Sequence, residues 1–434
     1  MRKQRSKNEQ QKAAEMVSPD EGLTAVYLWE MRDAPVSTLL LGDAQSYDAW
    51  AQEISSGNWF GDRVFYQAPL YPYFLALIYT FLGRDFFIVR IIQVAIGTAS
   101  CLFLARAGRY FFSKKTGVIS GILIALYPTA IFFDCLIQKA VLGFFFMSVF
   151  LYLAGKTIHN PKGLWWILMG MILGCMGLTR ENALILIVVI LFWIYVYFRT
   201  MPFKKTVAWG ALLVCGLAII LIPVGLRNKI VGGDFVLTTS QFGSNLYIGN
   251  NNMSDGRYRP LRPDRGDWRF ERQDATELAE EAIGRKLSPS EVSQYWVGQT
   301  VSYIRAEPMQ WIGLLVKKWH LVWNALEVGD AESQYAHYKW SFALKWLGFF
   351  FHFGVICPLA VFGICLPMIG VVGLFAAAGI TGSREFFREK NTKHILVCLL
   401  LVFISAILVN WKIFNKEEFT ASTYYNIAHD LSVQ

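Results

Sequence analysis

Long apolar runs recur along the chain and leave few folds open to it. An α-helix needs about twenty apolar residues to cross a bilayer, and several runs come close to that length. We predict membrane spans at 87–105, 117–133, 136–155, 164–178, 183–198, 207–226, within 342–380 and at 395–413. Only 17% of the residues are charged, against about 25% in a typical soluble domain. The sequence therefore predicts an all-α polytopic membrane protein.

Basic residues gather in alternate loops between these runs. The first such loop holds Arg106, Arg109, Lys114 and Lys115, and later ones hold Lys156 with Lys162 and Arg199 with Lys204 and Lys205. Loops rich in Lys and Arg stay in the cytoplasm. This bias accounts for the net charge of +9, so no nucleic-acid partner is expected. It also places Asp43, Asp134, Arg180, Glu181 and Arg227 together on the opposite, external face.

The stretch 40–73 is polar and aromatic, and it precedes the first span. It holds the carboxylates Asp43, Asp48, Glu53 and Asp62, which a bilayer interior does not tolerate, so it must lie at one surface. The apolar run 70–83 is too short to span and is expected to form an interfacial or re-entrant helix. We therefore assign 1–22 to a disordered basic N-terminus, 23–86 to an external loop with a juxtamembrane helix, and 87–226 to the transmembrane bundle.

Residues 227–341 are expected to form an external loop domain. Their Gly- and Asn-rich first part favours short strands and turns. Capping boxes at 274–277 and 288–291 each predict a helix start, and the segment around 311–323 is an amphipathic interfacial helix.

The C-terminal part is expected to return to the membrane. Residues 342–413 are assigned to C-terminal transmembrane helices, with a single crossing within 342–380. The tail 414–434 has the residue spacing that begins a tetratricopeptide helix, although one such helix cannot bury its apolar face alone.

Several charged residues near the external ends of spans are candidates for chemistry. Each has a structural alternative. Asp43 could cap a helix, Asp134 could pair with Lys139 at a helix end, and Arg90, an intramembrane cation and hence a functional candidate, could extend to the interface. Arg180 and Arg227 could anchor their helices there, and Tyr66 could belong to the aromatic belt.

The order of several short motifs adds a resemblance to a known family. They are Gly42-Asp43-Ala44, Tyr47, Tyr66-Gln-Ala-Pro-Leu-Tyr-Pro-Tyr73, Arg90, Gln93, Leu126-Tyr-Pro, Phe133-Asp134, Lys139, Leu178-Thr-Arg180, Arg227-Asn228 and Gly243-Ser-Asn-Leu-Tyr-Ile-Gly249. This order resembles glycosyltransferase family 39 of the GT-C superfamily. The family includes bacterial relatives of protein O-mannosyltransferases and the lipid A aminoarabinose transferase.

The resemblance implies a GT-C-like transmembrane helix bundle with an external, mainly α loop domain. It implies an inverting transfer of a sugar from a polyprenyl-phosphate donor to a hydroxyl on an acceptor protein, lipid or glycan. The expected place is the external face of a bacterial cytoplasmic (inner) membrane, in contact with membrane lipid. By the same resemblance, Asp43 is the catalytic base and Asp134 a second acidic catalytic position.

Such a reaction needs cations where negative charge develops on the leaving phosphate. The basic residue that precedes Pro-Leu in the aminoarabinose transferases is replaced here by Gln67 and Ala68. Phosphate binding is therefore assigned to Arg90, Lys139 or Arg180. Tyr66 and Arg227 complete the predicted substrate-binding set.

No cofactor is expected. The cysteines form no CxxC pair and the histidines no HExxH pair, so neither a zinc site nor a divalent cation has support in the sequence.

Two family elements are not found, and they keep other functions open. Residues 1–42 show no span ahead of Asp43, and the sequence passes from Met368-Ile-Gly into Phe375-Ala-Ala-Ala-Gly without an Arg-Tyr-Arg-Leu-Pro motif. A shortened, mis-started or degenerate non-catalytic homologue is one alternative. A transporter or flippase is another, although it predicts internal repeats and mid-bilayer charges, whereas the charges here lie at one face.

Overall fold

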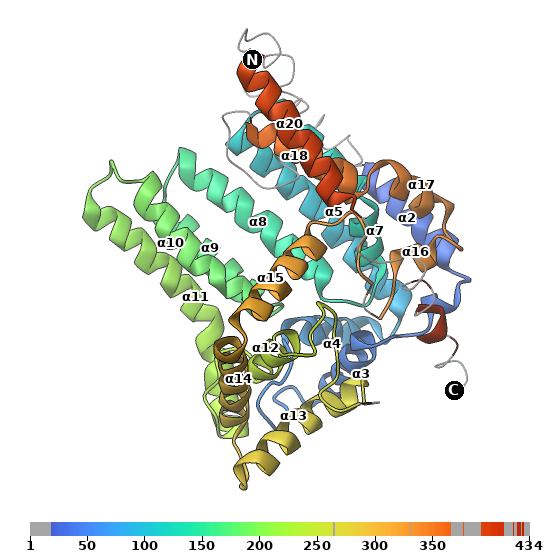
Figure 1. Cartoon of the computed structure of the whole chain (residues 1–434), viewed down its shortest axis with the longest axis vertical. Coiled ribbons are helices and arrows are strands. Elements are labelled where there is room, and N and C mark those ends of the chain that lie inside the picture. The colour runs from blue at the N-terminus through green and yellow to red at the C-terminus, as the bar shows by residue number, and fades with distance from the viewer. Residues whose placement is uncertain are drawn as a thin grey trace.

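The computed structural model describes residues 19–263, 265–329, 331–365, 376, 392–411, 420, 423–426 and 428. Helices make up the regular structure of this part of the chain, and it contains no strand. Figure 1 shows the long helices packed side by side, with shorter helices gathered at the lower end of the view. The prediction of an all-α polytopic fold is confirmed.

Four helical segments in the described residues are long and apolar enough to cross a membrane. They are α5 (Phe86–Phe111), α8 (Ala140–His159), α11 (Phe203–Gly232) and the segment Phe342–Val361. Shorter apolar helices join them, namely α9 (Gly163–Gly177), α10 (Leu186–Tyr197) after the 3-10 turn η2 (Glu181–Ile185), and the apolar part of α20 (Thr392–Val409). These helices occupy the predicted spans.

The predicted span 117–133 is not one straight helix. It consists of α6 (Lys114–Ala125) and α7 (Pro128–Cys135), which meet at 58°. Proline has no N–H to donate and disfavours helical geometry in the residue before it. Tyr127 is extended accordingly, and Pro128 begins the new helix. The bend turns α7 away from the axis of α6.

Small residues allow α9 and α11 to pack with their backbones close together. A Cβ added to Gly170 would lie 1.9 Å from the carbonyl oxygen of Leu213, and one added to Gly216 would lie 2.0 Å from that of Ile167. Helices in membranes associate largely through such contacts. The pair fixes the ends of α9 and α11 next to each other.

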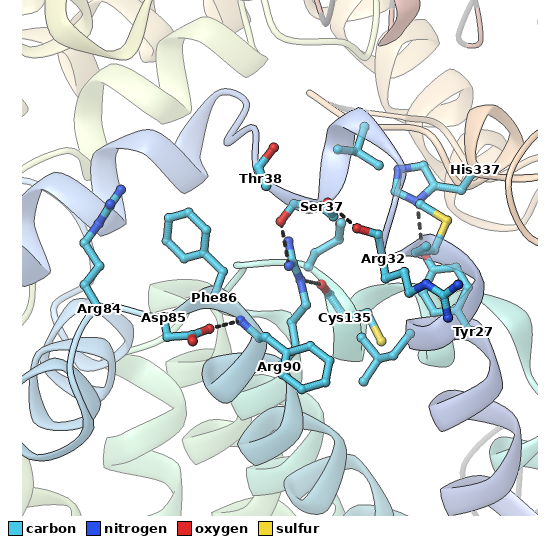
Figure 2. A pocket seen from close by; sticks show the side chains of 15 residues that line it. Tyr27, Arg32, Ser37, Thr38, Arg84, Asp85, Phe86, Arg90, Cys135 and His337 are labelled. Atoms are coloured by element: carbon cyan, nitrogen blue, oxygen red, sulfur yellow. Dashed lines mark hydrogen bonds between the residues drawn. The ribbon is translucent and has the colours of Figure 1, made fainter.

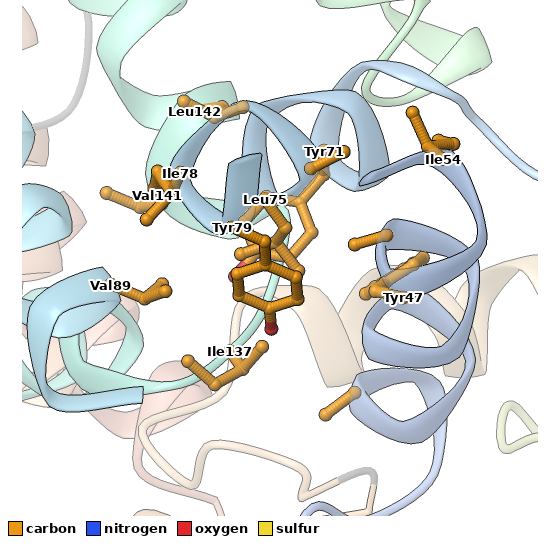
Figure 3. Close-up of a cluster of buried hydrophobic side chains, with 13 residues drawn as sticks. Tyr47, Ile54, Tyr71, Leu75, Ile78, Tyr79, Val89, Ile137, Val141 and Leu142 are labelled. Carbon is orange, nitrogen blue, oxygen red and sulfur yellow. The ribbon is translucent and has the colours of Figure 1, made fainter. Parts of the chain in front are cut away.

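The N-terminal polar stretch forms α2 (Pro19–Met31), the short turn η1 (Pro35–Ser37), α3 (Asp43–Ser55) and α4 (Leu70–Leu82). The predicted helix at 70–83 is thus present as α4. A buried apolar cluster joins α3 and α4 to α5 and α8, with Tyr47, Tyr71 and Leu75 fully buried at its centre (Figure 3). Burying each such side chain contributes about 1.5–3 kcal/mol. The cluster anchors α3 on the bundle.

The Gly- and Asn-rich first part of the 233–341 region contains turns and a helix but no strand among its described residues, so the prediction of short strands is wrong and that of turns is confirmed. The Gly- and Asn-rich part contains α12 (Phe242–Gly249), and α13 (Trp268–Ile283), α14 (Pro289–Ala306), α15 (Pro308–Val322) and α16 (Gln334–His337) follow. The capping box at Ser288 is confirmed, with reciprocal bonds between Ser288 and Glu291. The helix containing 311–322 is confirmed as α15.

The predicted helix start at Asp274 is wrong, because α13 begins earlier. Asp267 caps α13 by accepting a hydrogen bond from the N–H of Arg269. Asp274 lies in the helix interior, buried, with Arg265 3.2 Å away. The side chain of Asp274 therefore takes part in a buried ion pair and does not cap a helix.

The C-terminal region is helical at α17 (Phe342–Phe350), α18 (Phe353–Cys365) and α20. The single predicted crossing is thus interrupted after Phe350. The second half of 342–380, nearly all of the N-terminal segment 1–22 and most of the tail 414–434 lie outside the described residues.

Candidate functional site

The ends of the spanning helices bring the predicted site residues to one end of the bundle. The N-termini of α5 and α8 and the C-termini of α9 and α11 lie there, because the chain alternates in direction from helix to helix. Lys114, Lys162 and Lys204 lie at the opposite helix ends, at the starts of α6, α9 and α11. The grouping that loop charges predicted therefore matches the course of the chain through the bundle.

Asp43 begins α3 at the point where the helix meets a distant loop. Gly42, the residue before it, has φ +57°, and a Cβ there would lie 2.7 Å from the Cβ of Ala331. Glycine is required at such a position because it tolerates this conformation and leaves room for the neighbour. Asp43 occupies the first helical turn, where the helix dipole favours an acidic side chain.

Two side chains fix the carboxylate of Asp43. The hydroxyl of Tyr47, one turn along α3, donates a hydrogen bond of 3.0 Å to Oδ2. The ammonium of Lys139 lies 3.9 Å from the same oxygen and 5.5 Å from the centre of the Tyr47 ring. The side chain of Asp43 remains 33% exposed. It is therefore held in place yet open to a ligand.

A buried chain of contacts ties Tyr47 to the loop that carries Lys139. The Tyr47 ring packs edge-on against Tyr71 at 5.3 Å. Tyr71 donates to Gln93 at 2.6 Å, and Gln93 donates in turn to the backbone carbonyl of Leu136 at 2.7 Å. Burial raises the pKa of the Tyr47 phenol, and the charge of Asp43 adds to this effect. Tyr47 is thus a fixed hydrogen-bond donor to Asp43.

A cavity of about 320 Å³ opens beside Asp43, and we name it the Asp43 cavity. Lys139 and Arg180 also line it. Arg180 precedes η2 and is exposed, and its guanidinium makes no hydrogen bond or ion pair within the described part of the chain. The cavity thus combines one accessible carboxylate with two cations from separate loops.

The loop after α15 brings two further carboxylates to this cavity, which sequence reasoning missed. Glu327 accepts a 2.7 Å hydrogen bond from the hydroxyl of Tyr127, and burial raises its pKa. Glu332 lies 3.0 Å from Nε2 of His337. The acids of the segment 327–332 were visible in the sequence, but no local pattern linked them to Asp43.

Asp134 lies apart from this cavity. It is buried in α7 and is not among the residues that line the Asp43 cavity. Its carboxylate packs against α5, so that a Cβ added to Gly97 would lie 2.0 Å from Oδ2. The structure therefore does not bring Asp134 together with Asp43.

Arg90 lines a different cavity of about 400 Å³, shown in Figure 2. Its guanidinium donates to the backbone carbonyls of Cys135 at 2.9 Å and Ser37 at 2.7 Å. Figure 2 shows these bonds with Tyr27 and His337 farther along the same wall. These contacts join α5 to η1 and α7, so Arg90 has a structural role in this arrangement.

Tyr66 and Arg227 line a third cavity of about 340 Å³, which we name the Arg272 cavity. Arg227 donates to the carbonyls of Phe60 and Arg63 and stacks 3.8 Å above the Phe65 ring. It therefore holds the loop between α3 and α4. The hydroxyl of Tyr66 lies 3.2 Å from Glu271 on α13. The predicted site residues are thus spread over three cavities.

A metal centre has no obvious ligand set in the described residues. No group of three or more His, Cys, Asp or Glu side chains is placed there to hold an ion. Glu327 and Glu332 line the Asp43 cavity with the hydrogen-bond partners already given.

Comparison with known protein families gives a match over part of the chain. Residues 66–225 match the family model described as dolichyl-phosphate-mannose-protein mannosyltransferase. A search of curated proteins finds no match to the chain. The matched region contains Tyr66, Arg90, Asp134, Lys139 and Arg180, whereas Asp43 and Arg227 lie outside it. The predicted resemblance to this group of glycosyltransferases is confirmed.

Proposed function

We propose, on the premise of this family match, that the chain transfers a sugar from a polyprenyl-phosphate donor to an acceptor hydroxyl in the Asp43 cavity. The match supports a membrane glycosyltransferase of the mannosyltransferase type. The observation that carries the finer proposal is the convergence of Asp43, Lys139 and Arg180 on one cavity. These groups come from three separate segments, namely the first turn of α3, the start of α8 and the turn before η2, and together they supply a base and two cations.

Asp43 acts as the base in this proposal. Its carboxylate accepts the proton of the acceptor hydroxyl while the hydroxyl oxygen forms a bond to the anomeric carbon of the sugar. The bond between that carbon and the phosphate oxygen breaks, and its electron pair leaves with the polyprenyl phosphate. A single displacement of this kind inverts the anomeric centre. The hydrogen bond from Tyr47 keeps the Asp43 carboxylate in the required orientation.

Lys139 and Arg180 receive the leaving phosphate. Negative charge grows on the phosphate oxygens as the bond breaks, and fixed cations stabilise that charge more than they stabilise the starting donor. Arg180 forms no ion pair in the described part of the chain, so its charge is available to a ligand. The polyprenyl chain would extend into the membrane beside the bundle.

A transfer assay with purified protein in lipid vesicles tests the proposal. A short-chain polyprenyl-phosphate mannose should label an added acceptor extract, whereas guanosine diphosphate mannose should not. Label from the nucleotide sugar alone would overturn the donor assignment. Movement of the intact donor across the vesicle membrane without transfer would support the flippase alternative instead.

We also propose that the Asp43 cavity faces outward. The helix directions and the basic loops support this orientation, because positively charged loops stay in the cytoplasm. Cysteine labelling of intact cells tests it with Met253→Cys and Lys115→Cys, both at exposed positions. A membrane-impermeant reagent should modify the first and spare the second, and the reverse pattern would overturn the orientation.

A further inference from the structure

The Arg272 cavity is a second polar hollow near the first turns of α3. Its walls come from α3, from the loop between α3 and α4, from the C-terminal end of α11 and from α13 of the 233–341 region. Ser46 lines the Arg272 cavity and does not line the Asp43 cavity. Ser46 follows Asp43 by three residues, and side chains at that spacing are neighbours on one face of a helix. The first turn of α3 therefore contributes a side chain to each of the two cavities.

Positive charge dominates the walls of the Arg272 cavity. Four arginines line it, with two carboxylates among the lining residues. These are Arg63, Arg227, Arg269 and Arg272 against Glu53 and Asp62. Arg63 pairs with Asp62 at 2.7 Å, and Arg269 pairs with Asp267 at 2.6 Å. Two cationic side chains are thereby neutralised locally, and two are not.

Arg272 is the least compensated of these residues. It is half-buried, and its guanidinium makes no hydrogen bond or ion pair within the described ranges. Burial lowers its pKa and the neighbouring charge of Arg63 lowers it further, while the charge of Asp62 offsets part of this shift. A half-buried cation beside another cation costs free energy unless an anion joins them. An anionic ligand bound beside Arg272 would therefore stabilise this arrangement.

Arg227 adds fixed positive charge to the same wall. It donates to backbone carbonyls, which are neutral acceptors, and its Nε is buried without a hydrogen-bond partner. No carboxylate in the described part of the chain forms an ion pair with it. The charge of Arg227 therefore contributes to the positive electrostatic potential in the cavity. Its hydrogen bonds to the loop carbonyls fix the position of the guanidinium.

Aromatic rings lie between these cations. Trp50, Phe65, Tyr66 and Trp268 line the cavity. The indole N–H of Trp268 donates to Gln45 on α3 at 3.3 Å, which ties α13 to the helix that begins with Asp43. Aromatic faces carry partial negative charge and so attract the C–H groups of a sugar ring. Arginines and aromatic faces together suit a sugar that bears an acidic group.

We propose that the Arg272 cavity binds an anionic group, phosphate or carboxylate, on the sugar acceptor. This inference rests on the proposed function, since it gives the acceptor a place beside the Asp43 cavity. In this proposal Lys139 and Arg180 bind the donor phosphate, and Arg227 and Arg272 bind the acidic group of the acceptor. An acidic glycan or glycolipid then places its hydroxyl toward Asp43 while its charged group remains in the Arg272 cavity.

Calorimetric titration of the purified full chain tests this assignment with four probes. Mannose 6-phosphate and glucuronic acid represent the two acidic groups, methyl mannoside is the neutral sugar, and farnesyl phosphate represents the donor lipid. We expect saturable binding of at least one acidic sugar, and the probe that binds identifies the acidic group. Arg272→Gln should weaken this binding by about tenfold or more, and Arg272→Lys should restore part of it.

Arg305→Gln is the matched control, because Arg305 is exposed on α14 and lies outside the cavity. It removes the same charge and should leave binding unchanged. Melting curves check the fold of each variant, and Arg272→Gln should not melt earlier, since it relieves repulsion from Arg63.

Three results would overturn the inference. They are equal binding of methyl mannoside, equal loss in Arg272→Gln and Arg305→Gln, and weaker farnesyl phosphate binding in Arg272→Gln but not in Lys139→Gln. The Asp43→Asn variant separates this inference from the proposed function, because it should bind the acidic sugar normally. Normal transfer by Asp43→Asn would overturn the proposed function and leave the binding result standing.

Discussion

The ammonium of Lys139 lies 3.9 Å from the Oδ2 atom of Asp43, an oxygen that also accepts the hydrogen bond of Tyr47. The three residues come from α3 and from the loop ahead of α8, and a buried cluster shared by both elements holds them in this geometry. The proposed base and the proposed phosphate-binding cation are thus placed side by side before any ligand arrives. Preorganisation of this kind lowers the cost of reaching the transition state.

Lys139→Gln should retain the fold and lose most of the transfer activity. The amide is similar in reach but carries no charge, so the leaving phosphate loses a fixed cation. Removing one such stabilising group lowers kcat by about 100-fold or more. Initial rates with a polyprenyl-phosphate sugar measure this effect, with the melting temperature as a check on folding. A rate within about threefold of the wild type would remove Lys139 from the site.

Arg227→Met should loosen the loop between α3 and α4. The guanidinium donates to the carbonyls of Phe60 and Arg63 and stacks on Phe65, and hydrogen bonds to a charged donor contribute about 1.5–3 kcal/mol each. Limited proteolysis should cut the loop near Gly61 faster in this variant, and the melting temperature should fall. Lys229→Met on the same helix is the control, because Lys229 is exposed and bonds only locally to Gly233. Equal sensitivity of the two variants would contradict the structural role of Arg227.

Gly97→Ala should destabilise the bundle. The added Cβ would lie 2.0 Å from the carboxylate of Asp134, and relieving such an overlap costs about 1–3 kcal/mol. Gly143→Ala is the matched control on α8, because nothing lies within 4 Å of its added Cβ. That control should be neutral or more stable by up to about 1 kcal/mol, the gain in helix propensity. Thermal melts in detergent compare the two, and equal melting temperatures would contradict the packing of Asp134 on α5.

Glu327 should make stability depend on pH in a specific direction. Burial raises its pKa above the ordinary value, so over a range of pH the folded protein keeps the proton that the unfolded chain has released. The free energy of unfolding therefore falls as pH rises through that range, by at most about 1.4 kcal/mol per pH unit for one proton. Glu327→Gln should flatten this fall. Melting curves between about pH 4 and pH 7 measure it, and an unchanged slope in the variant would contradict the assignment.

The long helices could be predicted because apolar runs of span length have few alternatives in a membrane. The placement of Asp43 and Arg180 at one end of the bundle could also be predicted, since loop charges fix which helix ends share a face. That they meet Lys139 in one cavity could not. The face of the helix on which Asp134 lies could not, because it depends on the bend at Pro128. The position of a residue along a span and the direction in which its side chain points around the helix axis are separate properties. The hydropathy of the sequence predicts only the first.

The polar regions were harder to predict for a different reason. Gly and Asn around α12 favour turns locally, yet α12 packs against α14 and is helical. Glu327 and Glu332 reach the Asp43 cavity only because the loop after α15 folds back onto α7 and α3, where Gly42 allows Ala331 to approach. Such contacts between distant segments leave no periodic signal in the sequence.

Sugar transfer by Asp43→Asn tests the central proposal most directly. Asparagine keeps the size of the side chain and the first turn of α3 but cannot accept a proton. We expect donor binding close to that of the wild type and a loss of transfer of about 100-fold or more. Asp33→Asn, at a highly exposed carboxylate outside the cavity, should keep full activity. Transfer by Asp43→Asn at the wild-type rate would contradict the account.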